Sequence, residues 1–333
     1  MATIYEVSKL AGVSLATVSR VINNSGKVTP ATRQKVLAAM EQLGYRPNAI
    51  AQSLASNRSN SVGVLVPELH GPFFGIMLSS IEDELRAFGK HAIITAGHSD
   101  EQKEKESIEF LSSRQCDALI LHTFAVTTEW LLDLADEPPA IFVIGRDIPK
   151  IAGRCFYLDN ERGSYLATRA LIQLGHENLA YLAGPLWKSD AQGRLAGFRR
   201  ALNEAGLDFD EKLLAEGNDQ EASGRAAMVR LLGAGSPFSG LVCANDEMAV
   251  GAIEEARQRG RTIPEDLSVV GFDNVFFTRY MHPALSTVNY PVDLMGRMAA
   301  RAVLRDVYGQ RGLQVQNHFE PTFVPRASIA RHA

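Results

Sequence analysis

The sequence predicts a small all-α head that contains a helix-turn-helix, followed by an α/β core of two parallel-sheet subdomains. Three short helical patterns fill the first 45 residues. Beyond residue 62, strand-like apolar runs alternate with helical patterns, and the alternation restarts near residue 160. A length of 333 residues leaves room for two or three domains, which agrees with this division.

Charge is divided unevenly between the two parts. The first 60 residues hold seven Lys or Arg and two Glu, a formal charge of +5; the whole chain is at −4, so the rest carries −9. A basic head on an acidic body is typical of a phosphate-binding module joined to a globular domain, although chance clustering would give the same charges.

The first predicted helix spans residues 4–11. Thr3 and Glu6 have the spacing of a capping box, and Gly12 ends the helix. The residues expected on its inward face are Ile4, Val7 and Leu10.

Ser14 is a good N-cap for a second helix over residues 15–22. Its inward residues are Val18, Val21 and Ile22. The outward face is small and polar, and it carries Arg20, whose guanidinium can offer two N–H donors to O6 and N7 of guanine in a major groove. Two helices joined by a tight turn also form ordinary helical hairpins, so the geometry alone leaves both interpretations open.

A third helix is expected after Thr29, with Pro30 in the first helical position and Gly44 at its end. Its expected apolar face comprises Val36, Leu37, Met40 and Leu43. Three short helices around one small core make a compact unit. The polar stretch that follows, up to residue 61, is predicted to be a linker with one potential helix.

Two runs in the head are highly specific. They are Ala11-Gly12-Val13-Ser14-x-x-Thr17-Val18-Ser19-Arg20-Val21-Ile22-Asn23 and Gly44-Tyr45-x-Pro47-Asn48-x-x-Ala51. Through them, residues 3–55 closely resemble the head of the lactose repressor/galactose repressor family of transcriptional regulators, with the galactose-repressor branch especially similar. The resemblance favours DNA binding over an ordinary hairpin.

The resemblance implies particular DNA contacts. Leu15, Ala16 and Arg20 would meet base edges, and Leu54 would wedge between central base pairs and kink the DNA. Without the resemblance, Leu54 would be interpreted as a weakly buried hinge residue. Phosphate contacts are implied mainly for Ser14, Thr17, Ser19 and Asn23. The full set of DNA-binding candidates is Thr3, Ser14, Leu15, Ala16, Thr17, Ser19, Arg20, Asn23, Lys27, Asn48 and Leu54.

Polar residues gather just beyond the ends of five strand-like runs of the core. These runs are residues 62–66, 140–144, 179–183, 241–244 and 268–272. Ligands of parallel sheets bind beyond the carboxyl ends of the strands, often in a crevice between two units. Asp and Arg side chains suit vicinal hydroxyls, and aromatic rings can cover the apolar face of a sugar. Taken singly, each residue is better explained as a helix cap, a turn residue or a core residue, and only the grouping favours a site.

The core resembles the same family over nearly its whole length, and through it the periplasmic sugar-binding proteins. The runs that carry this resemblance are Pro72-Phe73-Phe74-Gly75, Arg194-Leu195-Ala196-Gly197-Phe198, Ala244-Asn245-Asp246-x-Met248-Ala249-x-Gly251-Ala252 and Gly271-Phe272-Asp273. The resemblance implies that Arg194, Asn245 and Asp273 grip a small-molecule effector. The full set of effector-binding candidates is Pro72, Phe73, Phe74, Arg146, Trp187, Lys188, Asp190, Arg194, Asn245 and Asp273.

The expected division is a DNA-binding domain at 1–47, a hinge helix and linker at 48–61, and an effector-binding and dimerisation core at 62–333. The resemblance places three crossings between the subdomains, near residues 160, 290 and 321. The N subdomain would then comprise about 62–160 and 291–320, and the C subdomain about 161–290 and 321–333.

Several pocket positions depart from the relatives. Trp187 and Lys188 replace small polar residues of the lactose repressor, Asn274 stands where an aspartate is common, and Gln220 stands where the galactose repressor is acidic. Galactose is therefore not carried over as the effector. Lys188 near the two candidate arginines suits a sugar phosphate or a sugar acid, and a neutral glycoside suits the site at least as well.

The expected function is a repressor of carbohydrate-utilisation genes that binds a pseudo-palindromic operator as a homodimer and is released by its effector. A dimer is favoured over a tetramer because no heptad-rich tail follows Arg326. The alternative within the family is a purine-type regulator, whose ligand tightens DNA binding. A sugar-binding transport protein would instead carry a signal peptide and lack the basic head.

An enzyme is not expected, because the sequence has no G-x-S-x-G, P-loop or H-E-x-x-H motif. No cofactor or metal is expected either. The three widely spaced cysteines suit a reducing cytosol. The first residues do not form a signal peptide, and no apolar run is long enough to span a bilayer. The expected location is therefore cytoplasmic, with no membrane partner.

Overall fold

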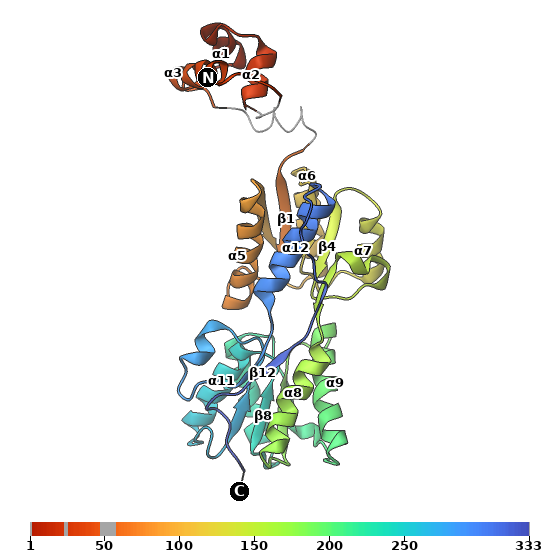
Figure 1. Ribbon diagram of the computed structural model, residues 1–333. Coiled ribbons are helices and arrows are strands. Elements are labelled where there is room, and N and C mark those ends of the chain that lie inside the picture. The colour runs from red at the N-terminus through yellow and green to blue at the C-terminus, as the bar shows by residue number, and fades with distance from the viewer. Residues whose placement is uncertain (1, 23–25, 47–57, 333) are drawn as a thin grey trace. The chain divides into compact units, whose positions relative to one another are not determined.

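The computed structural model describes residues 2–22, 26–46 and 58–332. The chain divides into two compact units, Met1–Asn60 and Ser61–Ala333 (Figure 1). The predicted hinge helix falls within residues 47–57 and lies outside the described residues.

The head consists of α1 at Ile4–Ala11, α2 at Leu15–Ile22 and α3 at Pro30–Gln42. The predicted capping box is present: the Glu6 amide donates to Thr3 Oγ1 at 3.4 Å, and the Thr3 amide donates to the Glu6 carboxylate at 2.7 Å. Gly12 ends α1 with a φ of 66°, in the left-handed region that favours glycine. Thr29 caps α3, and Pro30 occupies its first turn as predicted.

A small hydrophobic cluster holds the three helices together; its buried members are Val7, Val18, Val21, Val36 and Ala39. Leu10 and Leu37 were expected to face inward, but they are 46% and 51% exposed. Those two expectations are wrong because the inward stripes run one residue away, through Ala11 in α1 and through Val36 and Ala39 in α3. A shift of one residue turns a helical side chain by about 100°.

The N subdomain is built on a parallel six-stranded sheet with the order β11-β5-β4-β3-β1-β2. Its strands are β1 Ser61–Val66, β2 His91–Ala96, β3 Ala118–Leu121, β4 Ala140–Ile144, β5 Cys155–Leu158 and β11 His318–Phe319. Its helices are α5 Pro72–Ala87, α6 Glu101–Ser113, α7 Thr128–Ala135, α12 Val292–Asp306 and the 3-10 helix Pro149–Arg154. Alternate strand residues are buried against α5 and α12 on one face and against α6 and α7 on the other.

The C subdomain is built on a parallel four-stranded sheet with the order β7-β6-β8-β9. Its strands are β6 Leu179–Ala183, β7 Leu214–Glu216, β8 Gly240–Cys243 and β9 Ser268–Val270. Its helices are α8 Asn160–Gln173, α9 Ser189–Glu204, α10 Glu221–Gly233 and α11 Asp246–Gln258, with 3-10 turns at Glu211–Leu213 and Phe276–Arg279. α8 and α9 bury one face of this sheet, and α10 and α11 bury the other.

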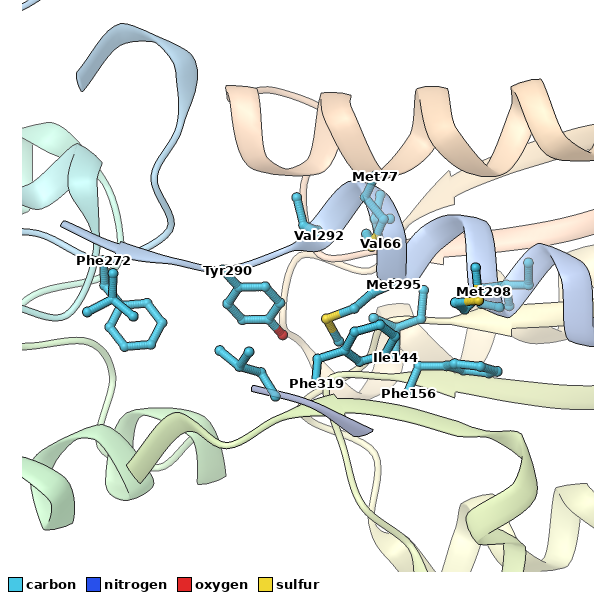
Figure 2. Packing of buried hydrophobic residues seen from close by; sticks show 14 of the residues in the cluster. Val66, Met77, Ile144, Phe156, Phe272, Tyr290, Val292, Met295, Met298 and Phe319 are labelled. Atoms are coloured by element: carbon cyan, nitrogen blue, oxygen red, sulfur yellow. The ribbon is translucent and has the colours of Figure 1, made fainter. Parts of the chain in front are cut away.

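The chain passes between the two sheets at three places: from β5 to α8, from β10 (Thr287–Asn289) to α12 and from β11 to β12 (Thr322–Val324). β10 and β12 pair antiparallel as a separate two-stranded sheet. Tyr290 follows β10 and lies between Phe272 of the C subdomain and Met295 of α12 (Figure 2). One hydrophobic cluster therefore runs through both subdomains.

Two helix pairs of the C subdomain approach each other at glycines. A Cβ at Gly197 of α9 would overlap the carbonyl oxygen of Glu161 in α8, and a Cβ at Gly251 of α11 would overlap that of Glu221 in α10. Glycine at these two positions lets the backbones touch. The close packing fixes α9 and α11, both of which begin at the carboxyl edge of the sheet.

Some element boundaries differ from the sequence prediction. The sequence pattern predicts a helix from Arg194, but α9 begins five residues earlier, at Ser189, so Asp190 lies on its first turn and not in a loop. The sequence also predicts a helix from about Gly75, and α5 begins three residues earlier, at Pro72. Strands β5, β7, β10, β11 and β12 were not predicted.

Across the described ranges, no helix has the length and apolarity to cross a membrane. The same ranges contain no cluster of three or more His, Cys, Asp or Glu side chains placed to hold a metal ion. Cys116, Cys155 and Cys243 are buried free thiols. Burial raises the pKa of Cys116 and of Cys155 to about 11, so both are protonated at neutral pH.

Candidate functional site

The outward side of α2 is a small polar surface. Ser14, Ala16 and Arg20 are exposed, and Leu15, Thr17 and Ser19 are half-buried. Ser14 caps the helix as predicted, because its Oγ accepts a hydrogen bond from the Thr17 amide at 3.2 Å. Val18 and Val21 anchor the opposite side of α2 in the head cluster. The helix thus presents short side chains and one arginine to solvent.

The Arg20 side chain runs beside Gly26. A Cβ at Gly26 would lie 3.3 Å from Arg20 Cδ, and the φ of Gly26 is 72°, so any other residue there would strain the backbone and crowd the arginine. Thr3 is exposed, although its hydroxyl belongs to the capping box, and Lys27 is exposed beyond α2. Three further DNA-binding candidates lie outside the described residues: Asn23, Asn48 and Leu54.

A cavity of about 360 Å³ lies between the N and C subdomains, a size typical of small-molecule pockets. The N subdomain lines it with residues that follow β1, β2 and β3, and the C subdomain with residues that follow β6, β7, β8 and β9. This is the edge at which ligands bind to parallel sheets. Tyr290, at the crossing after β10, also lines the cavity.

Eight of the ten predicted effector-binding residues line this cavity: Phe73, Phe74, Trp187, Lys188, Asp190, Arg194, Asn245 and Asp273. The other two do not. Pro72 is the first residue of α5. Arg146 instead donates hydrogen bonds to the Val126 carbonyl oxygen and to Thr128 Oγ1, both at 2.7 Å. The strand-end position of Arg146 was therefore a misleading signal, because its hydrogen bonds commit the guanidinium to neighbouring backbone and side-chain oxygens.

Arg194 is a buried cation in the wall of the C subdomain. Its guanidinium donates to Asn160 Oδ1 at 2.8 Å and to the Ala244 carbonyl oxygen, and it lies 3.8 Å from the centroid of the Phe272 ring. Its Nη1 is 3.8 Å from Asp273 Oδ1. Burial opposes the charge, but nearby carboxylates, Asp273 first, raise the pKa of Arg194 above its ordinary value, so the group stays charged.

Two carboxyl groups accompany Arg194. Asp273 has a φ of 108°, which L side chains rarely adopt, and burial raises its pKa well above the ordinary value while Arg194 opposes that rise. Burial also raises the pKa of Asp190, whose Oδ1 has no hydrogen-bond partner among the described residues. A ligand hydroxyl that donates to this oxygen would satisfy a buried acceptor.

Lys188 and Asn245 are the N-cap residues of α9 and α11. Lys188 is buried, and its Nζ donates to Asp219 Oδ2 at 2.8 Å. Asn245 Oδ1 accepts a hydrogen bond from the Met248 amide at 2.8 Å, and its Nδ2 donates to the Asp219 carbonyl oxygen at 2.7 Å. Asn245 is therefore both a helix cap and a cavity residue.

The wall of the N subdomain is aromatic and contains a buried histidine. Phe73 packs edge-on against Phe74 and against Tyr290, with ring centroids 5.3 and 5.0 Å apart. The His122 ring lies 5.6 Å from Phe74 and 5.0 Å from Phe124. Burial, and next the nearby Lys188 charge, lower the pKa of His122 to about 3, so the imidazole is neutral. Its Nδ1 has no hydrogen-bond partner in the described part of the chain.

Comparison with known proteins accounts for both parts. Residues 3–48 match the bacterial regulatory proteins of the lacI family, and residues 168–329 match the periplasmic binding protein-like domain. Over 330 residues the chain is 41% identical to the HTH-type transcriptional regulator GalR of Escherichia coli (strain K12), covering 99% of this chain and 96% of that protein. The chain belongs to the lacI family. It is a DNA-binding transcriptional regulator.

Solved structures of lacI-family regulators share the architecture. The Lac repressor dimer bound to operator and the anti-inducer ONPF matches at 27% identity over 99% of both chains, with a TM-score of 0.86. A complex of the transcriptional regulator CelR with cellobiose matches at 32% identity over 98% of this chain and 100% of that chain, with a TM-score of 0.71. The predicted fold, a helix-turn-helix head and a periplasmic-binding-protein-like core, is confirmed.

The sequence prediction missed part of the regulator's cavity. His122 and Phe124 directly follow β3, so the same strand-end rule would have found them. Asp219 follows β7, a strand that was not predicted, and Tyr290 lies at a crossing between subdomains. Gln220 lines the cavity, as its expected pocket position implied, whereas Asn274 does not. The other lining residues that were not candidates are Pro67, Glu68, His70, His98, Ser99, Pro185, Asn218 and Glu247.

Proposed function

We propose that this regulator represses genes of carbohydrate use, and that a neutral sugar or sugar derivative in the cavity releases it from operator DNA. A homodimer on a pseudo-palindromic operator follows from the need to match two-fold symmetry in protein and DNA. The proposed role is binding in the cytoplasm, without catalysis. The observation that carries the proposal is a cavity between two subdomains whose buried cations already lie beside carboxylates.

The charge of the cavity lining favours an uncharged ligand. Lys188 pairs with Asp219 at 2.8 Å, and Arg194 lies 3.8 Å from Asp273, so each cation already has an acidic neighbour. The carboxyl groups of the lining are Glu68, Asp190, Asp219, Glu247 and Asp273. A phosphate or a sugar acid would have to displace Asp219 or Asp273 from beside its cation in a desolvated site.

The remaining groups suit a sugar. The Asp273 carboxylate can accept from one hydroxyl while the neighbouring Arg194 guanidinium donates to the next. Phe73, Phe74 and Trp187 offer ring faces to the apolar side of a pyranose. The complex of the related CelR with cellobiose agrees with a sugar as ligand.

On the DNA side, we propose Leu15, Ala16 and Arg20 as the residues that read bases. The support is the polar outward side of α2, held in place by its buried opposite side. Leu54 would open a base step. The other DNA-binding candidates of the head would hold the DNA backbone: Thr3, Ser14, Thr17, Ser19, Asn23, Lys27 and Asn48. The proposal includes a DNA-binding domain at residues 1–47, a hinge helix and linker at 48–61, and a core at 62–333 that the three crossings divide into two subdomains.

Coupling between the cavity and the head requires that the effector bind two states of the core with different affinity. A ligand held by both subdomains favours one arrangement of them. Such a change would reach the hinge helices through the N subdomains of the dimer. Release from DNA is the proposed outcome.

A ligand screen coupled to an operator assay tests the function. Operator DNA is first selected from a random pool with the full-length protein. Thermal shifts are then measured with D-galactose, cellobiose, D-glucose, glucose 6-phosphate, gluconate and guanine, and each hit is added to the operator-binding assay. We expect a neutral sugar to raise the melting temperature and to weaken operator binding.

The variant Asp273→Ala is the matched control for this screen. It should bind the selected operator normally and lose both responses to the sugar. Hits confined to the phosphate and the acid would overturn the neutral class of effector. A hit that tightens operator binding would overturn release and indicate a corepressed regulator.

A further inference from the structure

The loop after β3, residues 122–127, is held by a buried carboxylate. Glu104 of α6 is 1% exposed, and its two oxygens accept three backbone N–H groups. The donors are Phe124 at 3.1 Å, Ala125 at 3.0 Å and Val126 at 2.9 Å. Charge-assisted bonds to three consecutive amides fix the course of the backbone at Phe124.

Arg146 also holds this loop, by donating hydrogen bonds to oxygen atoms of the loop and of the following residue. Its Nη1 donates to the Val126 carbonyl oxygen and its Nη2 to Thr128 Oγ1, both at 2.7 Å. Thr128 is the first residue of α7, so Arg146 ties the end of the loop to the following helix. Glu104 thus accepts hydrogen bonds from the backbone N–H groups of residues 124–126, and Arg146 donates one to the carbonyl oxygen of Val126. Neither side chain lines the cavity.

Phe124 of this loop lies opposite Lys188. Lys188 Nζ is 4.7 Å from the centroid of the Phe124 ring, within the range of a cation–π contact. Phe124 belongs to the N subdomain, and Lys188 immediately precedes α9 of the C subdomain. The contact therefore spans the cavity from one subdomain to the other.

The surroundings of Lys188 strengthen this contact. Its side chain is 10% exposed, and its ammonium pairs with Asp219 of the C subdomain at 2.8 Å. The Trp187 ring is 5.6 Å away, on the same segment of chain. Since water is largely excluded, the ring of Phe124 supplies part of the environment that replaces hydration of the ammonium, and cation–π attraction is larger when the cation is desolvated.

We propose that Lys188 and Phe124 form a clasp that ties the two subdomains together, with Glu104 and Arg146 as the residues that position Phe124. The proposal rests on the proposed function in one respect: an effector that enters the cavity has to release or replace this contact. Lys188 then sets both the ease of opening and the shape of ligand that fits beside its ammonium.

Hydrogen exchange on the full-length protein without ligand tests the clasp. Lys188→Met removes the charge from the C subdomain but keeps a long side chain. We expect the amides of residues 122–127, in the other subdomain, to exchange roughly threefold faster or more. Phe124→Leu tests the reverse direction, and the amides of residues 186–190 should then exchange faster.

Arg199→Met is the matched control. Arg199 lies on α9, pairs with Glu211 at 2.6 Å and lies 5.8 Å from the Phe209 ring centroid, but all three residues are in the C subdomain. It should leave residues 122–127 unaffected. The double variant of Lys188 and Phe124 should exchange no faster than the faster single variant, because both changes remove the same contact.

Three results would overturn the clasp: unchanged exchange of residues 122–127 in Lys188→Met, an equal change in Arg199→Met, or additive effects in the double variant. Glu104→Gln should accelerate exchange at residues 122–127 and also at 186–190; an effect on the loop alone would remove Glu104 from the clasp.

A sugar-induced thermal shift without a clasp would leave the proposed function standing. A demonstrated clasp without any sugar-induced shift would count against the proposed function alone.

Discussion

The head and the core hold their functional side chains in opposite environments. In the head, Ser14, Ala16 and Arg20 stand in solvent, and helix caps with a small buried cluster set their positions. In the core, Arg194 and Asp273 are largely withdrawn from water, and each depends on the other for compensation of its charge. Substitutions at the functional surface of the head should therefore change recognition at little cost in stability, whereas those in the cavity should change both.

The largest effect is expected for Arg194→Met. Removal of this buried cation leaves Asp273 without its positive neighbour and leaves Asp190 with Lys188 alone, and the free energy of unfolding should fall by about 3–5 kcal/mol. Urea unfolding followed by circular dichroism measures the loss, and isothermal titration with the sugar found in the screen should show no binding. A variant as stable as the parent would break the proposed contrast between core and head.

The pH dependence of the core is the next largest effect. Asp246 is buried at the start of α11 and accepts hydrogen bonds from Thr287 Oγ1 at 2.6 Å and from the Val275 amide at 3.0 Å. Burial raises the pKa of Asp246 from 3.8 to about 7. The folded state therefore retains a proton that the unfolded state loses, and stability falls as the pH rises from about 4 to about 7.

Asp246→Asn isolates this effect. The parent should lose up to about 1.4 kcal/mol per pH unit relative to the variant between pH 5 and pH 7. Urea unfolding of both proteins across that range gives the difference. Parallel pH profiles would show that Asp246 is already ionised in the folded core.

In the head, Arg20→Ala should act on recognition alone. Loss of a bidentate contact should cost about 1–3 kcal/mol in binding to the selected operator and relax the preference at one guanine. Operator variants at each base pair, measured by fluorescence anisotropy, locate the position. Retained specificity at every base pair would show that Arg20 does not read a base. A large loss of head stability would contradict the expectation that substitutions on the head surface, unlike Arg194→Met in the core, change recognition without changing stability.

The smallest effect is expected for Thr29→Ala. Thr29 Oγ1 accepts a hydrogen bond from the Thr32 amide at 3.3 Å, and loss of this cap should lower the local stability of α3 by about 1 kcal/mol. Hydrogen exchange of the full chain should accelerate in α3 and stay constant in the core. Acceleration in the core as well would show that the two units do not unfold independently.

Short-range signals predicted the head well. The capping box of Thr3 and Glu6, the N-cap Ser14 and the Thr29-Pro30 pair each act within four residues, so the sequence contains the whole interaction. The inward faces were harder to predict, because one residue of rotation decides whether a leucine such as Leu37 is buried.

The cavity depends on longer-range relations that the sequence shows only in part. The strand-end rule predicted where ligands would bind, since Asn245 and Asp273 follow buried parallel strands. It did not predict where a side chain turns after leaving the strand. Arg146 follows β4 and Gly145, and its guanidinium donates hydrogen bonds to Thr128 and Val126, which lie 18 and 20 residues earlier in the chain. Asp219 and Tyr290 follow β7 and β10, in which polar residues interrupt any apolar run.

Tyr290 has a consequence for genetic studies of this regulator. Its ring lines the cavity, packs against Phe73 at 5.0 Å, belongs to the cluster shared by both subdomains and follows the strand at which the chain crosses between them. A screen for mutants that no longer respond to the inducing sugar should recover changes at Tyr290, and the same isolates should show altered basal expression. Such isolates should be sorted by basal expression before any of them is assigned to ligand recognition.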